Sequence, residues 1–310
     1  MIISASRRTD IPRFYFDWLT NRLAEGYVLV RNPMNYRQVS RVSLSPQVVD
    51  CIVLWTKDPS PMRGRLDALA PFPYYVQFTV NPYGADMETG LPEKETLLDT
   101  FAELAAILGP QCVVWRYSPV LFTERYTEQY HLASFRRFAQ RLEGSTLQCK
   151  LSFLDIYAKI KKRMSAMGVH EGAPDVQAAL AHTFMEIAAA HGISLSACGS
   201  TALADAGIPP ARCIDDKLIE AITGQRLHTK KDPGQRDVCY CVESVDIGAY
   251  DSCLNGCKYC YANLSDKTAR RNMQCKYDPQ SPMLLGNLEP GDKITERAMK
   301  SLIDPQVSMF

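Results

Sequence analysis

Residues 51–59, CIVLWTKDP, decide the fold class, because a run of five apolar residues passes directly into a polar loop. The same change occurs in residues 1–10, MIISASRRTD, and further apolar runs occupy 74–80, 113–117, 150–153 and 193–197. Between the runs, residues 94–108, 130–142 and 176–191 have the apolar spacing of amphipathic helices. Short apolar strands that alternate with helices are typical of repeated βα units.

This alternation predicts an α/β protein whose strands form a partial or full β/α (TIM-like) barrel, and it fits a doubly wound sheet less well. Further helices are expected at 16–26, 215–223 and 294–302, with a hairpin formed by 27–31 and 38–44. The composition changes after residue 224, where a polar stretch leads into a Cys-rich one. We therefore expect a β/α barrel over residues 1–224 and a Cys-rich segment over 225–310, packed at the barrel mouth.

Charged side chains follow or end several of the predicted strands. Because the carboxyl ends of barrel strands converge on one face, we expect these residues to form a shared ligand surface. Arginine and lysine there are suited to bind a carboxylate or another anion, and aspartate to bind hydroxyl groups. Polar residues are also the ordinary way for a loop to begin. The candidate catalytic residues are Arg7, Arg8, Asp10, Lys57, Arg116 and Asp155.

The overall charge gives the protein no general attraction for nucleic acid or for a membrane surface. The 310 residues include 35 Lys and Arg against 34 Asp and Glu, so a nucleic acid would need a local basic patch. The N-terminal residues lack the order of a secretory signal, and no apolar run is long enough to span a bilayer. We expect a cytoplasmic protein with no membrane partner, in which clustered thiols stay reduced and act as metal ligands.

The 11 cysteines are concentrated in the last third of the chain. Residues 253–260, CLNGCKYC, place Cys253, Cys257 and Cys260 in a Cys-x3-Cys-x2-Cys loop, and Gly256 allows the backbone to turn tightly. Three thiolates can hold three irons of a [4Fe-4S] cluster, whereas a site made only of cysteines needs four. The loop therefore predicts a C-terminal iron–sulfur segment whose fourth iron is open to a small molecule.

Four more cysteines form a possible second set: Cys198, Cys213, Cys239 and Cys241. Four thiols suit either a tetrahedral Zn²⁺ ion or a second [4Fe-4S] cluster with no open iron. The one-residue spacing of Cys239 and Cys241 is unusual for zinc and favours iron. The alternative is that Cys198 and Cys213 are small buried apolar residues.

The loop at 253–260 resembles the cluster loop of radical S-adenosylmethionine enzymes, with aromatic Tyr259 immediately before the last cysteine. This resemblance implies a partial or full β/α barrel, S-adenosyl-L-methionine bound at the open iron, and an electron donor such as ferredoxin or flavodoxin. It implies a 5′-deoxyadenosyl radical that abstracts hydrogen from a small-molecule or nucleotide-like substrate. Tyr259, Tyr261 and Asn263 become candidate cofactor-binding residues. In most of that superfamily the loop follows the first strand, whereas here it lies near the C-terminus.

A likeness over most of the chain connects it with a second family. The stretches IISASRRTDIP (2–12), YVLVRNP (27–33), IVLWTKDP (52–59) and DIGAY (246–250) resemble the domain-of-unknown-function family numbered eighteen forty-eight. That likeness implies the iron–sulfur assignment of the loop and no particular substrate.

A non-enzymatic zinc or iron–sulfur protein that recognises nucleic acid is the alternative from another functional class. Its phosphate contacts would come from two basic stretches, which a solvated helix face explains equally well. The residues concerned are Lys159, Lys161, Lys162, Arg163, Lys267, Arg270 and Arg271.

Overall fold

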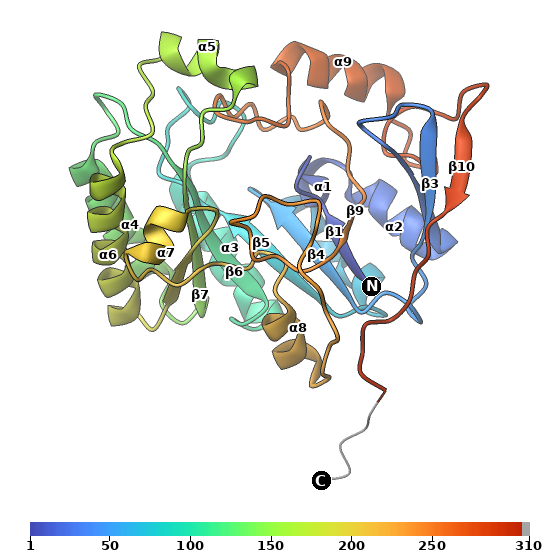
Figure 1. Ribbon diagram of the computed structural model, residues 1–310, viewed down its shortest axis with the longest axis horizontal. Coiled ribbons are helices and arrows are strands. Elements are labelled where there is room, and N and C mark those ends of the chain that lie inside the picture. Colours follow the sequence, from blue (N-terminus) through green and yellow to red (C-terminus); the bar gives the residue numbers. More distant parts are fainter. Residues whose placement is uncertain (306–310) are drawn as a thin grey trace.

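The computed structural model describes residues 1–305, which form a mixed α/β fold around a parallel sheet of seven strands (Figure 1). In spatial order the strands are β8 (Ser194–Ala197), β7 (Gln148–Phe153), β6 (Val113–Val120), β5 (Tyr74–Thr79), β4 (Cys51–Thr56), β1 (Ile2–Ala5) and β9 (Val245–Asp246). All neighbours in this sheet run parallel. β8 and β9 each have one neighbour, so within the described residues the sheet stays open at both edges.

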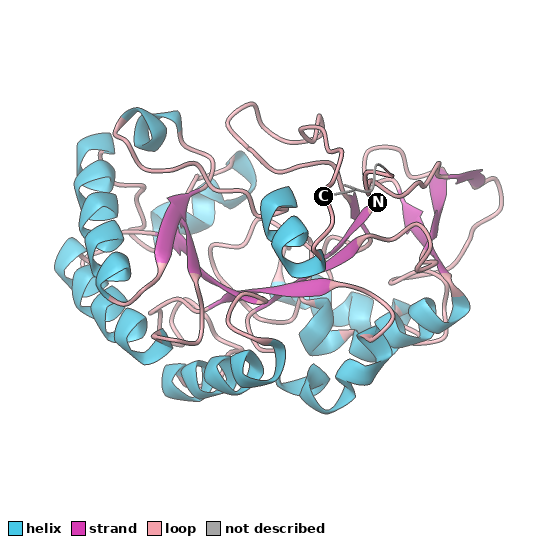
Figure 2. Ribbon diagram, turned by 90° about the horizontal axis from the view of Figure 1, so that it is seen from below, coloured by secondary structure: helices cyan, strands magenta, loops and turns pink. Residues whose placement is uncertain are grey.

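Helices cover one face of the sheet and later parts of the chain cover the other, and this burial on both faces is why its central strands are continuously apolar. The flanking helices are α2 (Phe16–Glu25), α3 (Lys94–Leu108), α4 (Glu128–Leu142) and α6 (Pro174–Ala190). Figure 2 shows helices lining one side of the curved strands. Beneath them Phe135 stacks on Trp115 and on Phe184, with ring centroids 4.8 and 4.2 Å apart. The six strands and these four helices are confirmed close to their predicted bounds.

The other face of the sheet is covered by later parts of the chain. Val53, Tyr75 and Val114 pack there against the residues around Cys213 and Cys241. The helix α8 (Asp216–Thr223) lies on the same face and matches its predicted bounds to within one residue. The Asp215 side chain caps its first turn, and Gly224 follows its last residue in the left-handed conformation. Segments that are distant in sequence therefore meet over the inner face of the sheet.

A second, smaller sheet contains the predicted hairpin. Its order is β10 (Lys293–Glu296), β3 (Gln38–Ser43) and β2 (Tyr27–Arg31), with β2 antiparallel and β10 parallel to β3. The helix expected at 294–302 is wrong, because pairing with β3 makes residues 293–296 a strand. The helix α9 (Asp266–Lys276) was not predicted; it buries Ala269 but little else, so its sequence has almost no apolar periodicity.

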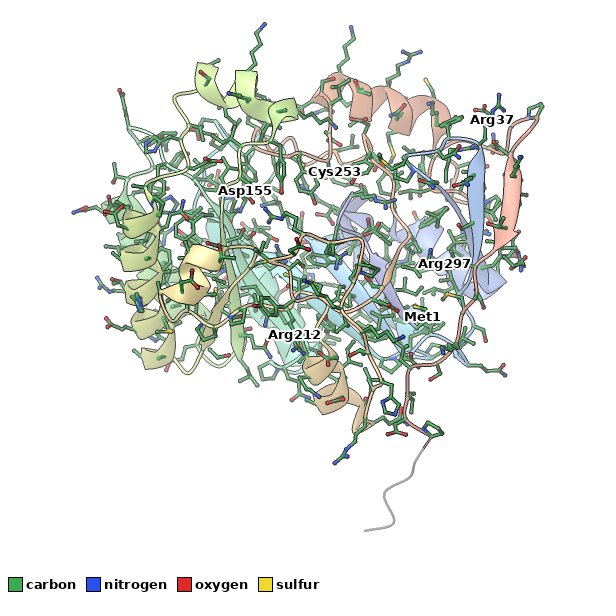
Figure 3. All side chains as sticks on the ribbon, in the orientation of Figure 1. Met1, Arg37, Asp155, Arg212, Cys253 and Arg297 are labelled. Carbon is green, nitrogen blue, oxygen red and sulfur yellow. The ribbon has the colours of Figure 1, made fainter. Side chains whose placement is uncertain are left out.

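Short elements complete the described chain. They are α1 (Ile11–Phe14), the 3-10 helix η1 (Ser60–Leu69), α5 (Ala158–Ala166) and α7 (Thr201–Asp205). Figure 3 shows the side chains of α5 and α9 extending outward at the same end of the molecule, with Cys253 lying below them. None of the helices in residues 1–305 combines the length and hydrophobicity needed to cross a bilayer.

Candidate functional site

A cavity of about 360 Å³ opens beside the carboxyl ends of the sheet strands. It collects every predicted site residue except Asn263. The predicted residues that line it are Arg7, Arg8, Asp10, Lys57, Arg116, Asp155, Cys198, Cys213, Cys239, Cys241, Cys253, Cys257, Tyr259, Cys260 and Tyr261. A larger cavity of about 610 Å³ shares only Arg8 with this set, so the smaller cavity is the candidate site.

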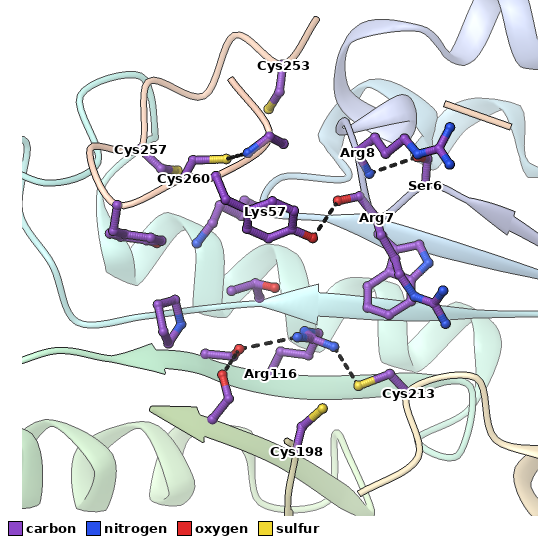
Figure 4. Close-up of a pocket in the computed structure, with 18 of the residues that line it drawn as sticks. Ser6, Arg7, Arg8, Lys57, Arg116, Cys198, Cys213, Cys253, Cys257 and Cys260 are labelled. Atoms are coloured by element: carbon purple, nitrogen blue, oxygen red, sulfur yellow. Dashed lines mark hydrogen bonds between the residues drawn. The ribbon is translucent and has the colours of Figure 1, made fainter. Parts of the chain in front are cut away.

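The two cysteine groups lie on opposite sides of this cavity. Figure 4 shows Cys253, Cys257 and Cys260 on one side and Cys198 and Cys213 on the other, with basic side chains between them. All of these thiols are free. Within residues 1–305, no three or more His, Cys, Asp or Glu side chains already have their donor atoms arranged around a metal position. Metal binding at either group therefore requires the thiols to turn toward a common centre.

Gly256 shapes the loop that carries the first group. Its φ is +67°, and a Cβ atom there would lie 2.1 Å from Oγ1 of Thr89. Only glycine meets both demands without strain. A hydrogen bond also fixes the end of the loop, where Sγ of Cys260 accepts from the Ala262 amide at 3.3 Å. Such an N–H donor stabilises a thiolate, the form that binds iron.

The loop is fastened to the segment between β5 and α3. The amide of Gly90 donates to Asn255 O at 3.0 Å, and that of Lys258 donates to Met87 O at 2.9 Å. Glu88 and Cys257 form an antiparallel bridge between these two contacts. The thiols are therefore carried by a loop that backbone hydrogen bonds hold in place.

Glu88, which sequence reasoning missed, is the centre of a buried polar cluster behind the loop. Its carboxylate lies 2.7 Å from Nζ of Lys57, contacts Nζ of Lys94, and accepts a hydrogen bond from the hydroxyl of Tyr259. Burial alone would raise the Glu88 pKa, but the two lysines outweigh it and lower that pKa. Burial alone would lower the pKa of Lys57, but the negative charges of Glu88 and Cys257 outweigh burial and raise that pKa. Lys57 thus remains an ammonium ion beside the thiols.

Asp10 acts as a connector between loops. Burial raises its pKa, while hydrogen bonds from the Lys57 amide and from Asn255 Nδ2, both at 2.8 Å, oppose the increase. Its other oxygen accepts from the Arg13 amide at 3.2 Å and so caps α1. With both oxygens engaged, Asp10 ties β1, β4 and the cysteine loop together.

The residues after β1 are held by Asp246 of β9, a second residue that was not singled out as functional. Its carboxylate accepts from Ser4 Oγ at 2.9 Å, Ser6 Oγ at 2.6 Å and the Arg7 amide at 2.8 Å. Gly248 permits this approach, because a Cβ there would lie 2.1 Å from Ser6 Oγ. The turn that presents Arg7 and Arg8 thus depends on a strand from the C-terminal part of the chain.

The second cysteine group lies beside two arginines. Nη1 of Arg116 donates to Sγ of Cys213 at 2.9 Å. The guanidinium groups of Arg7 and Arg116 lie 5.6 and 4.9 Å from the ring centroid of Trp55. Hydrogen bonds from Cys198 and Cys241 lower the pKa of both Cys213 and Cys239. Cys198 and Cys241 therefore act as hydrogen-bond donors on this side of the cavity, and Cys213 and Cys239 act as acceptors.

The remaining predicted residues lie at the edge of the cavity or outside it. Asp155 pairs with Arg236 at 2.6 Å, and both side chains are about half exposed. Tyr261 is 44% exposed, and burial of its hydroxyl together with Cys260 raises its pKa to about 12. Asn263 lies outside the cavity lining; its amide nitrogen donates to Cys253 O, which closes the cysteine loop.

Comparison with known proteins gives one family. No curated protein matches the chain. The model of the family described as Domain of unknown function (DUF1848) matches residues 2–262, a range that contains both cysteine groups and stops before Asn263. The chain therefore belongs to the family described as Domain of unknown function (DUF1848).

Proposed function

We propose that the protein is a radical S-adenosylmethionine-type iron–sulfur enzyme. The observation that carries the proposal is the position of Cys253, Cys257 and Cys260, three thiols of one anchored loop at the wall of a cavity lined by basic residues. The bound cluster would supply an electron that cleaves S-adenosyl-L-methionine into methionine and a 5′-deoxyadenosyl radical, which abstracts hydrogen from the substrate.

The surroundings of the loop fit a [4Fe-4S] cluster held by three cysteines. The Ala262 amide donates to Cys260 Sγ, and the Lys57 ammonium lies near Cys257 and Cys260, so both offset thiolate charge. Three thiolates leave one iron without a protein ligand, which suits binding of a cofactor with amino and carboxylate groups. Arg8 and Tyr261 at the cavity lining are then available to the cofactor or the substrate.

The fold suits this chemistry when the open sheet is taken as a partial β/α barrel. We propose that residues 1–224 form that barrel except for its edge strand β9, and that the rest of residues 225–310 closes its mouth. A cavity of about 360 Å³ lies near the lower end of the range for small-molecule sites, which favours a small or nucleotide-like substrate. The basic and aromatic lining would orient this substrate and exclude water. We propose a cytoplasmic location, because the cysteines must stay reduced to bind the cluster.

The electron donor would approach beside Cys260. The carbonyl oxygen of Cys260 accepts a hydrogen bond from Nη2 of Arg163 on α5 at 2.9 Å. The helix α9 follows the cysteine loop directly in the sequence. The two helices carry Lys159, Lys161, Lys162, Arg163, Lys267, Arg270 and Arg271. We propose an acidic ferredoxin or flavodoxin as the donor, with docking that weakens as salt increases.

Anaerobic reconstitution followed by incubation with S-adenosyl-L-methionine and dithionite tests the proposal. We expect 5′-deoxyadenosine from the parent protein and from Cys275→Ala, whose exposed thiol lies outside both groups. We expect none from Cys257→Ala. Equal product from Cys257→Ala, or no product from the reconstituted parent, would reject the proposed function.

A further inference from the structure

The second cysteine group is assembled by the main chain from three separate segments. Ala211 N donates to Ala197 O at 2.7 Å, which places Cys213 beside Cys198 at the end of β8. Val242 N donates to Ile214 O at 3.2 Å, which brings Cys241 to the same place. The group is therefore a product of the tertiary fold and is invisible as a local motif.

The four thiols form a closed ring of contacts. Cys198 hydrogen-bonds with Cys213 and Cys239, and Cys241 hydrogen-bonds with the same two residues. Cys213, Cys239 and Cys241 are buried, and the ring packs against an apolar cluster that includes Val53. Each thiol thus has two other thiols within hydrogen-bonding reach, in a largely dry setting.

The size of this ring distinguishes a single ion from a cluster. Four sulfurs bound tetrahedrally to Zn²⁺ at about 2.3 Å are about 3.8 Å apart, which is close to contact. In a [4Fe-4S] cluster each thiolate binds a different iron, so the sulfurs stand much farther apart. Thiols within hydrogen-bonding reach of one another need only turn toward a common ion, whereas a cluster would force the three segments apart.

Charge at the ring also suits a bound tetrathiolate. Binding of Zn²⁺ to four thiols forms four Zn–S bonds, releases four protons and leaves a net charge of −2. Arg116 donates to Cys213 Sγ at 2.9 Å, and the charge of Arg7 also acts on Cys241. The amides of Cys213 and Ile214 donate to Cys241 Sγ at 3.3 and 3.4 Å. Two cations and two N–H donors are thus in place to stabilise the negative charge of the zinc tetrathiolate.

We infer that Cys198, Cys213, Cys239 and Cys241 bind one structural Zn²⁺ ion. With four protein ligands the ion has no open position, so it would fasten the two later segments to β8 and support the cavity wall opposite the cluster loop. Arg7 and Arg116 would serve as its counter-charges. This assignment replaces their expected role of binding a substrate carboxylate.

Metal analysis of anaerobically reconstituted protein tests the inference. We expect about four irons and about one zinc per chain. Cys241→Ser should lose the zinc and keep the iron, whereas Cys257→Ser should lose the iron and keep the zinc. A reconstituted parent protein that contains zinc but no iron would count against the proposed function and leave the zinc inference standing.

Zinc X-ray absorption on the parent protein gives an answer even if Cys241→Ser does not fold. We expect four sulfur neighbours at about 2.3 Å. About eight irons without zinc would show a second cluster and overturn the inference, as would about five irons without zinc or a zinc ion with nitrogen or oxygen neighbours.

Discussion

Replacing Glu88 by glutamine removes a negative charge that faces two mostly buried lysines. The Lys57 and Lys94 side chains are 14% and 15% exposed, and Glu88 itself is fully buried. Removing one partner of a buried ion pair costs about 3–5 kcal/mol, because the other charge stays desolvated. Slight exposure of the lysines places the expected loss at about 3 kcal/mol of unfolding free energy. Urea denaturation at neutral pH measures this loss as a lower midpoint at unchanged slope.

Glu95→Gln is the matched control, because Glu95 also faces two cations. Its carboxylate lies 3.8 Å from Arg137 and 3.5 Å from Arg141, but it is 57% exposed. Water screens such pairs, so the expected loss is below about 1 kcal/mol. Equal losses in the two variants would refute the argument that burial gives the Glu88 cluster its strength.

Two further predictions concern protonation and backbone strain. Burial lowers the pKa of His131 to about 4, below the usual 6.5, so its contribution to stability is complete above pH 6.5 and is lost as the pH falls toward 4. The loss is about 3 kcal/mol, and the slope of unfolding free energy against pH should flatten in His131→Gln; an unchanged slope would contradict the prediction. Gly256→Ala should cost at least about 2 kcal/mol and lower the iron content, because it adds a clash with Thr89 to the positive φ. Gly224→Ala has a similar φ and open space, so it should cost about 1 kcal/mol; equal losses in urea would show that the clash is unimportant.

The central strands could be predicted because they are buried on both faces and are therefore continuously apolar. β9 could not, because Val245–Asp246 is too short to have a period and is a strand only through its pairing with β1. Residues 293–296 contain a helix-like pattern that is overridden by pairing with β3. In both cases the strand depends on a partner from a distant segment, and its own sequence lacks the apolar run that marks the central strands.

The same distinction applies to the site. Cys253, Cys257 and Cys260 are visible in the sequence because one short loop supplies all three ligands. Glu88 is not visible, because its partners come from separate segments and nothing in its own loop marks it. The long loop after β5 carries three acidic residues, Asp86, Glu88 and Glu93, and the sequence does not show which of them is buried.

The proposed open iron is tested most directly by electron paramagnetic resonance of the reconstituted, reduced protein with and without S-adenosyl-L-methionine. If the cofactor binds a cluster held by Cys253, Cys257 and Cys260, its addition changes the spectrum of the reduced cluster. A cluster spectrum that stays the same at saturating S-adenosyl-L-methionine would contradict an open iron in this loop.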